Sequence, residues 1–323
     1  NFEKLFKNSV THHKFYAPAR DTLYSFGSIL VGKEIMGASF SDHRMNIVSS
    51  ENKEITLNFE NSIFGRLFND GFDSSITGYG FHPFCKVIKY VRCEVFNEPL
   101  KWYDGIFNII QYTRIKAHFL KIGSHRDINP YIIQSMFEYI EEDNPANLLF
   151  VHNRVPHLCH QCNDGLAGMA EKYFDYKYRK KNTILNLIAD RKEAYFINLK
   201  FIDSLVGEIF DKIEKNKNYK KNKTLVILSS DHWAKDYYGD FKTRPINDNT
   251  IPYPTLFIAK IIGDNEKFDI YDPDSGIHTQ ELIQNFLNDK ISSHSDINKF
   301  FSKKSGYNVL MGTEIQFNEK RDF

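Results

Sequence analysis

The run of residues 224–230, Thr-Leu-Val-Ile-Leu-Ser-Ser, constrains the fold of this chain more than any other segment. A short, continuous run of aliphatic and β-branched residues is typical of a buried parallel strand, and such strands belong to sheets covered by helices. The run ends in Asp231 and His232, and ligands of open α/β sheets bind beyond the carboxyl ends of the strands. The pattern predicts a metal-binding carboxylate and imidazole there. The alternative is a polar loop in which His232 makes only local hydrogen bonds.

Helical and strand-like patterns alternate along the chain, which predicts a layered α/β fold. The sequence contains no internal repeat and no low-complexity linker, so we expect one large domain with a short C-terminal subregion. Strands are expected at about 74–79, 147–152, 224–230 and 254–260, and helices at about 22–31, 61–69, 101–120, 130–141, 191–215, 278–290 and 296–303.

The charge balance gives no support to two classes of partner. Lys and Arg total 42 against 41 Asp and Glu, and a net charge of +1 offers no attraction to nucleic acid or to an acidic membrane surface. No apolar run approaches the roughly 20 residues of a membrane span, and no signal peptide is visible. The chain begins with Asn1 rather than Met, so we expect an upstream segment that could carry an address or an anchor.

The four cysteines fall in two local pairs, Cys85 with Cys93 and Cys159 with Cys162. The spacing of the second pair suits a redox pair, half of a zinc site or a short-loop disulfide. A zinc knuckle needs two pairs of that spacing, and Cys85 with Cys93 does not provide the other one. Thiols or disulfides are therefore the favoured interpretation.

Thr22 is the first candidate for catalysis. A loop that contains Pro18 leads into the expected helix, and Gly32 follows that helix as a natural C-cap. Thr22 falls at the amino-terminal end of the helix, where unpaired backbone N–H groups and the helix dipole favour negative charge. An alkoxide at Thr22 and a phosphate beside it would both be stabilised there. The alternative is an ordinary threonine N-cap, which is common.

The expected strand at about 147–152 also ends in polar and cationic residues, namely His152, Arg154 and His157. Two imidazoles and a guanidinium beside a strand end suit the oxygens of an anionic ester or its leaving group. The alternative is a turn that contains incidental histidines.

The order and spacing of these segments resemble the alkaline phosphatase superfamily, in its sulfatase-like branch of arylsulfatases, lipoteichoic acid synthases and phosphoethanolamine transferases. The interval from Thr22 to Gly32 matches that from the sulfatase nucleophile to a Thr-Gly pair, and the transferases place threonine at the nucleophile position. The Val-Pro before His157 resembles a His-x-Pro-His element, and residues 71–78 are similar to a Gly-Tyr-x-Thr segment. Asp231 with its histidine matches the metal motif, and the resemblance covers about residues 1–290.

The resemblance implies an alkaline-phosphatase-like α/β fold, with a mixed and mostly parallel sheet sandwiched between helices. It also implies a sulfatase-like catalytic domain at residues 1–290 and a C-terminal helical subregion or tail at 291–323. Such domains usually face the periplasm or the outside of the cell, so an extracytoplasmic location is expected, with a membrane anchor in the missing upstream segment.

A divalent metal ion follows from the same resemblance, and the donor set of carboxylate, imidazole and hydroxyl suits zinc or manganese better than calcium. The resemblance makes Thr22, Asp231 and His232 the metal ligands and Thr22 also the nucleophile. His157 would contact the ester oxygens or protonate the leaving group. Substrate-binding residues would be His152, Arg154 and Lys235. The implied function is a phosphoester transferase or hydrolase acting on an anionic ester of a cell-envelope glycan or lipid.

Departures from the family pattern bear on the reaction. Thr22 cannot become the formylglycine that arylsulfatases need, and Tyr79 stands where the family has a lysine, so phosphoester chemistry is favoured over sulfate hydrolysis. The family's first strand, which carries an acidic metal ligand, precedes the segment that opens this chain, so the expected metal site is incomplete here. The alternatives are a sulfuric ester hydrolase and an inactive, sulfatase-like binding protein or fragment.

Overall fold

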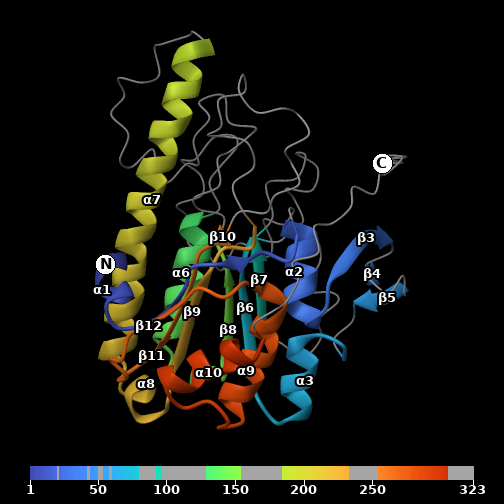
Figure 1. Ribbon diagram of the computed structural model, residues 1–323, viewed down its shortest axis with the longest axis vertical. Helices are drawn as coiled ribbons and strands as arrows, with labels where there is room; N and C mark the ends of the chain where they lie inside the picture. The colour runs from blue at the N-terminus through green and yellow to red at the C-terminus, as the bar shows by residue number, and fades with distance from the viewer. Residues whose placement is uncertain are drawn as a thin grey trace, which may run out of the picture. The chain divides into compact units, whose positions relative to one another are not determined.

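The computed structural model describes residues 1–19, 22–41, 44–49, 54–57, 60–79, 92–96, 129–153, 184–232 and 254–304. Helices and strands alternate through these ranges, which confirms the prediction of a mixed α/β fold (Figure 1). Contacts divide the chain into two compact units. The first contains residues 1–2, 72–86 and 90–218, and the second contains residues 3–71, 87–89 and 219–323.

A four-stranded sheet forms the centre of the second unit. Its order is β12 (Phe268–Ile270), β1 (Val10–His12), β11 (Phe257–Ile261) and β9 (Leu225–Ser229). β1 is parallel to β12 and antiparallel to β11, and β11 is antiparallel to β9. The carboxyl ends of β12, β1 and β9 therefore meet at one edge of this sheet, which is the edge that leads into Asp231.

The prediction for the strand at 224–230 is corrected in two respects. β9 is half-buried rather than fully buried, and β11, its partner in the described sheet, is antiparallel. β9 pairs with β11 in a continuous register over its whole length, from Leu225 opposite Ile261 to Ser229 opposite Phe257. An aliphatic run predicts a strand but contains no information on the direction of a partner that lies some thirty residues further along the chain.

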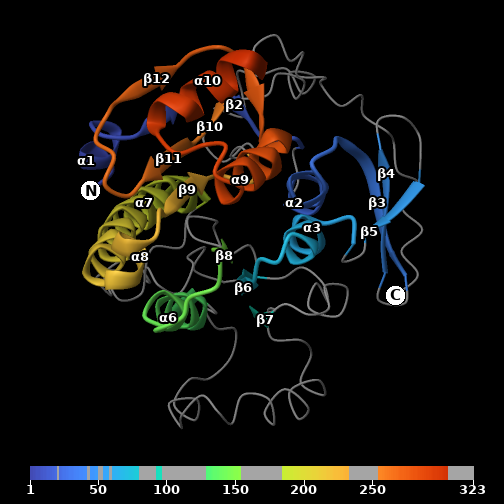
Figure 2. The ribbon, with the colours of Figure 1, turned by 90° about the horizontal axis from the view of Figure 1, so that it is seen from below.

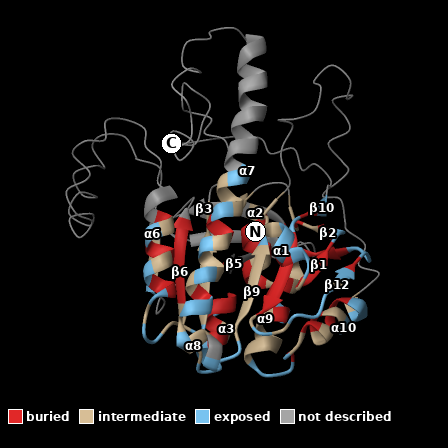
Figure 3. Cartoon of the chain, turned by 90° about the vertical axis from the view of Figure 1, so that its left-hand side faces the viewer, coloured by how far each residue is buried: buried red, intermediate tan, exposed pale blue. Residues whose placement is uncertain are grey.

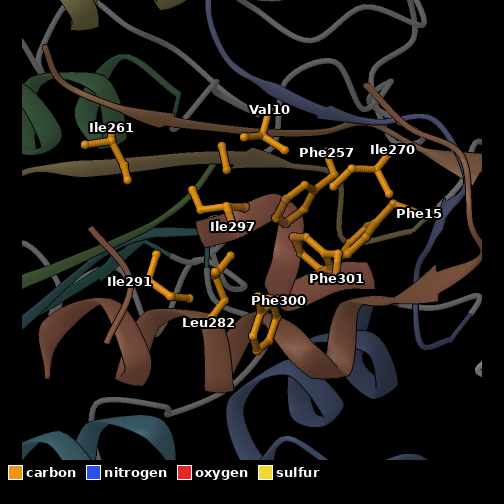
Figure 4. Packing of buried hydrophobic residues seen from close by; sticks show 11 residues of the cluster. Val10, Phe15, Phe257, Ile261, Ile270, Leu282, Ile291, Ile297, Phe300 and Phe301 are labelled. Carbon is orange, nitrogen blue, oxygen red and sulfur yellow. The ribbon is translucent and has the colours of Figure 1, made fainter. Parts of the chain in front are cut away.

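The main hydrophobic core lies between this sheet and two helices, α9 (Thr279–Leu287) and α10 (His294–Lys304). α10 lies against the sheet (Figure 2), and Ile297, Phe300 and Phe301 recur at helical spacing on it, so one helix face enters the core (Figure 4). The Phe257 ring lies 4.2 Å from that of Phe15 and 5.3 Å from that of Phe301. Each buried Phe contributes about 1.5–3 kcal/mol of hydrophobic free energy.

A capping box begins α10. The Ser293 hydroxyl accepts the backbone N–H of Asp296 at 3.2 Å, and the Asp296 carboxylate accepts the backbone N–H of Ser293 at 3.1 Å. Two N–H groups that the helix cannot satisfy are thus paired, which explains why the helix starts here. The pKa of Asp296 lies below its usual value, because its carboxylate accepts hydrogen bonds from the N–H of Ser292, which is the largest contribution, and from the Ser293 hydroxyl.

Helix α2 (Thr22–Val31) runs in the same unit, together with α1 (Phe2–Phe6) from residue 3 onward and α3 (Ile63–Asn69). A small sheet joins β10 (Pro254–Thr255), β2 (Phe15–Tyr16) and β13 (Asp274–Ser275), and an antiparallel sheet joins β3 (Ile35–Ser41), β4 (Arg44–Ser49) and β5 (Glu54–Leu57). The short 3-10 helix η4 (Gly276–His278) leads from β13 into α9. The predicted strand at 254–260 is thus two strands in different sheets, separated by Leu256.

The first unit contains a parallel sheet in the order β7 (Arg92–Phe96), β6 (Ser74–Tyr79) and β8 (Leu148–His152). Its helices are α6 (Asn129–Ile140) and α7 (Ile184–Lys215), and α8 (Lys217–Lys221) follows α7. Ser75, Ile76 and Thr77 of β6 are buried, and Figure 3 colours buried residues of this strand red. The Thr77 hydroxyl donates to Ser135 at 2.8 Å, and Ser135 donates to the Glu94 carboxylate at 2.7 Å, so a hydroxyl chain ties α6 to β6 and β7.

The described ranges bear differently on three further predictions. The helix expected at 101–120 lies outside them. None of the helices that the structure describes is both long enough and apolar enough to cross a membrane. Cys93 is disulfide-bonded, which decides between the thiol and disulfide interpretations for this residue.

Candidate active site

Helix α2 places Thr22 in its first turn, as the sequence predicts. Ser25 follows three residues later, and side chains at that interval lie on the same helix face with their Cβ atoms about 5–6 Å apart. The Ser25 side chain is fully buried, and its hydroxyl donates a hydrogen bond to the backbone carbonyl of Asp231. The first turn of α2 is therefore joined directly to the turn that follows β9.

The two expected metal ligands lie in that turn. The Nε2 atom of His232 is 3.7 Å from Oδ2 of Asp231, and their side chains are 12% and 26% exposed, so the turn is largely covered. The Ser230 hydroxyl donates to the carbonyl of His232 at 2.7 Å, and the Ser230 N–H donates to the carbonyl of Leu256 at 3.2 Å. Both backbone carbonyls of the ligand dipeptide are thus bound by serine hydroxyls.

The donor chemistry fits a divalent metal. A carboxylate oxygen and an imidazole nitrogen lie within reach of one ion, and the hydroxyl of Thr22 is one turn of helix away from the bond that holds Asp231. Nitrogen and oxygen donors of this kind suit zinc or manganese. Across the ranges described above, no group of three or more His, Cys, Asp or Glu side chains is arranged to hold a metal ion.

His152 occupies the end of β8 in the first unit, where it is half-buried opposite Gly78 of β6. Gly78 has a φ of +151°, and a Cβ at this position would lie 2.4 Å from the carbonyl oxygen of His152. The strand end is therefore built by a close backbone approach that only glycine allows. Arg154, His157 and Lys235, the remaining predicted site residues, lie outside the described residues.

Sequence reasoning missed the two serines. Ser25 lies three residues after Thr22, and this interval on a predicted helix could have indicated a shared face. Ser230 directly precedes the ligand pair, and a serine hydroxyl at that place commonly bonds nearby backbone. Local sequence could have identified the acceptor of Ser230, which is two residues away, but not that of Ser25, which is 206 residues away.

A second Asp–His pair, also missed, lies beside α2. His278 of η4 hydrogen-bonds through Nδ1 to Oδ1 of Asp274, a carboxylate that is only 1% exposed. η4 is packed closely around the loop that precedes Thr22, since a Cβ on Gly276 would lie 2.8 Å from Cδ of Pro18. His278 of this pair therefore lies in the 3-10 helix that contacts α2.

Comparison with solved structures shows the same fold. The phosphonate monoester hydrolase from Silicibacter pomeroyi superposes with a TM-score of 0.54 at 12% identity, covering 89% of this chain and 68% of that chain. The lipoteichoic acid synthase LtaP from Listeria monocytogenes gives 0.53 at 10% identity, covering 88% and 64%. Ps i-CgsB in complex with k-i-k-neocarrahexaose gives 0.53 at 13% identity, covering 90% and 66%. The chain thus spans about two thirds of the length of these proteins.

A comparison with curated proteins finds no match. The model of the Sulfatase family, in contrast, matches residues 40–257, a range that includes His152, Asp231 and His232 and begins after Thr22. This range is more than half of the chain, and the solved structures above share its fold. The chain belongs to the Sulfatase family.

Proposed function

We propose that this protein is a metal-dependent phosphoester transferase or hydrolase that uses Thr22 as its nucleophile. The observation that carries the proposal is the hydrogen bond from Ser25 to the carbonyl of Asp231. It joins the helix turn that begins with Thr22 to the turn that presents a carboxylate and an imidazole. A nucleophile needs an activating group within reach, and this arrangement supplies one.

The residues take distinct roles in the proposed reaction. Asp231 would bind the ion through a carboxylate oxygen, and His232 would bind it through a ring nitrogen. The hydroxyl oxygen of Thr22 would be the third ligand from the described residues. A bound divalent ion lowers the pKa of a coordinated hydroxyl and offsets negative charge in the transition state. Thr22 would lose its proton and attack phosphorus as the ester oxygen departs, and water or an acceptor hydroxyl would then release the phosphoryl group from Thr22.

The helix terminus supports the same role. The first backbone N–H groups of α2 have no partner within the helix, and a ten-residue helix carries partial positive charge at this end. A phosphoryl group on Thr22 would lie against these donors. His152, Arg154, His157 and Lys235 are proposed to bind the ester and its leaving group, in line with the family resemblance.

We propose that the substrate is an anionic ester of a cell-envelope glycan or lipid. We also propose that the reaction takes place outside the cytoplasm. The disulfide at Cys93 supports this compartment, because disulfides persist in oxidising surroundings and are rare in the cytosol. Among the solved structures of similar fold are a complex with k-i-k-neocarrahexaose and a lipoteichoic acid synthase, and we take these two as support for a glycan or envelope-polymer substrate.

A sulfuric ester hydrolase is the second candidate. It is favoured by the match to the Sulfatase family and by a solved structure in complex with its substrate D-glucosamine-2-N,6-O-disulfate, at a TM-score of 0.52. Thr22 weighs against it, because threonine cannot form the aldehyde that sulfatases use. Release of sulfate from an aryl sulfate would favour this candidate over the first.

The test combines metal analysis with turnover by the full-length protein. We expect bound zinc or manganese, hydrolysis of bis(p-nitrophenyl) phosphate, and at least about a thousandfold loss of that hydrolysis in Thr22→Ala. Asp231→Asn should lose both metal and turnover. Thr279→Ala is the matched control, because Thr279 also begins a helix of the second unit and is buried.

Two outcomes would contradict the proposal. Unchanged turnover in Thr22→Ala would remove Thr22 from its role as nucleophile. A metal-free wild-type protein that shows no ester hydrolysis, and whose Asp231→Asn variant behaves identically, would leave the inactive binding protein as the remaining interpretation.

A further inference from the structure

The carboxyl edge of the four-stranded sheet carries a row of exposed side chains, Tyr271, His13 and Leu256, that the proposed reaction does not use. His12 is paired with Ile270 in the sheet, so the next residues, His13 and Tyr271, lie level with each other. Leu256 lies level with Ser230 and accepts a hydrogen bond from its N–H. Tyr271 is 60% exposed, Leu256 is 38% exposed, and the His13 side chain is 40% exposed.

Two of the three side chains are tied to one face of the sheet. His12, Ile270 and Phe257 belong to the face that packs against α10, as the His12 contacts and the core cluster show. Successive side chains of a strand alternate between faces, so Asp269 lies on the other one, and its bond to His13 and the stacking of His13 on Tyr271 associate both rings with that face. Leu256 directly precedes Phe257, and we infer the same face for it from this alternation. Neighbouring strands are about 4.8 Å apart, which places Tyr271 about 14 Å from the strand that ends in Asp231.

The Tyr271 ring is held in a fixed orientation. It stacks on the His13 ring with centroids 4.6 Å apart and planes inclined by 7°. His13 is fixed in turn by Asp269, whose Oδ1 lies 2.8 Å from Nε2, and the Asp269 carboxylate also binds Lys267 at 2.7 Å. These two partners hold the pKa of Asp269 below its usual value, with Lys267 as the larger contribution.

We propose that the row formed by Tyr271, His13 and Leu256 binds a sugar ring of a glycan substrate, about three strands away from the ester that reacts at Thr22. This inference rests on the proposed function, because it assigns the row to the same substrate. The electron-rich face of Tyr271 receives the C–H face of a pyranose ring. The carboxylate of Asp269 and the ammonium group of Lys267 lie beside it, where they can accept from and donate to the ring hydroxyls.

The chemistry of the row favours a sugar over an acyl chain. A lipid tail needs a continuous apolar groove, whereas charged residues border this row and the exposed aromatic ring is flat and rigid. A sugar combines one apolar ring face with polar edges, which matches an aromatic platform beside an acid and a base. Tyr271 and the turn that contains Asp231 and His232 lie at the same edge of the sheet. One extended oligosaccharide could therefore reach from Tyr271 to that turn.

The test measures binding of three hexasaccharides, derived from carrageenan, heparin and chitin, to full-length wild type, Tyr271→Ala and Leu256→Ser. We expect at least one hexasaccharide to bind the wild type and Tyr271→Ala to bind it about tenfold more weakly, as the loss of one aromatic stack predicts. Phe68→Ala is the matched control, because Phe68 is 49% exposed on α3 and should leave hexasaccharide affinity unchanged.

The possible outcomes are separable. Failure of all three hexasaccharides to bind the wild type, or equal affinity in Tyr271→Ala, overturns the inference. Loss of binding to phosphatidylglycerol vesicles in Tyr271→Ala, without any hexasaccharide binding, overturns it in favour of a lipid surface. Tyr271-dependent binding of a hexasaccharide by a protein that shows no metal-dependent ester hydrolysis would leave the sugar site standing and reject the proposed function alone.

Discussion

The hydroxyl of Ser25 donates a hydrogen bond to the backbone carbonyl of Asp231, across 206 residues of sequence. This bond joins helix α2 to the turn that carries the two proposed metal ligands, Asp231 and His232. Because Ser25 is buried and lies one turn after Thr22, we propose that the bond positions the proposed nucleophile relative to these ligands. Removal of the bond should therefore lower metal affinity.

We expect Ser25→Ala to lower zinc affinity about tenfold, which is the size of effect that supporting residues around metal sites usually have. The measurement is competition against a chelating dye. Ser28→Ala is the control, because Ser28 is equally buried one turn further along α2, where its hydroxyl accepts the N–H of Ile35 at 3.1 Å. Equal zinc affinity in the two variants would refute a positioning role for Ser25.

The stability of the protein should fall as the pH is lowered from about 6.5 towards 4. His12 is 2% exposed, and burial lowers its pKa from 6.5 to about 4 although Asp274 acts in the opposite direction. The unfolded chain takes up the proton first, so the stability present above pH 6.5 is lost as the pH falls. The shift corresponds to about 3 kcal/mol.

Thermal unfolding at pH 7 and pH 4.5 measures this effect. In His12→Phe, which keeps a ring among Phe15, Phe257 and Phe301, the difference in melting temperature between the two pH values should shrink. Parallel pH profiles in the two proteins would show that other groups cause the acid sensitivity.

The hydroxyl chain through Ser135 should show strong coupling in a double-mutant cycle. Thr77 is fully buried and donates to Ser135, so Ser135→Ala leaves a buried hydroxyl without its acceptor, at a cost of about 1–3 kcal/mol. Adding Thr77→Val removes that hydroxyl, and the double variant should be more stable than the sum of the single losses predicts. Urea unfolding gives these values, and strictly additive losses would contradict the coupling.

Gly32→Ala should destabilise the end of α2 by about 1–2 kcal/mol or more. Gly32 has a φ of +66°, and a Cβ there would lie 2.1 Å from Oε1 of Gln280, a side chain that is 2% exposed. The same substitution in a Gln280→Ala background separates the two causes, because only the backbone strain remains. If the loss of stability is identical in both backgrounds, the contact with Gln280 contributes nothing.

Local patterns predicted the helices well. The bounds of α2, α3, α6 and α10 agree closely with expectation, because periodic apolar residues and end signals such as Gly32 are properties of the segment itself. The short strands β1, β2, β12 and β13 escaped prediction. Each has only two or three residues, and β1 acquires its strand character from partners more than 240 residues away.

The sequence by itself determined where the candidate side chains lie along the chain: a threonine at a helix start, and a carboxylate with an imidazole after an aliphatic strand. Tertiary structure alone decided that the first turn of α2 is bonded to the turn after β9, because the Ser25 hydroxyl and the Asp231 carbonyl lie 206 residues apart in the sequence. It also decided that Tyr271 stacks on His13 along the same edge. Pairing between distant strands follows from the summed burial of many residues, and no local pattern encodes it.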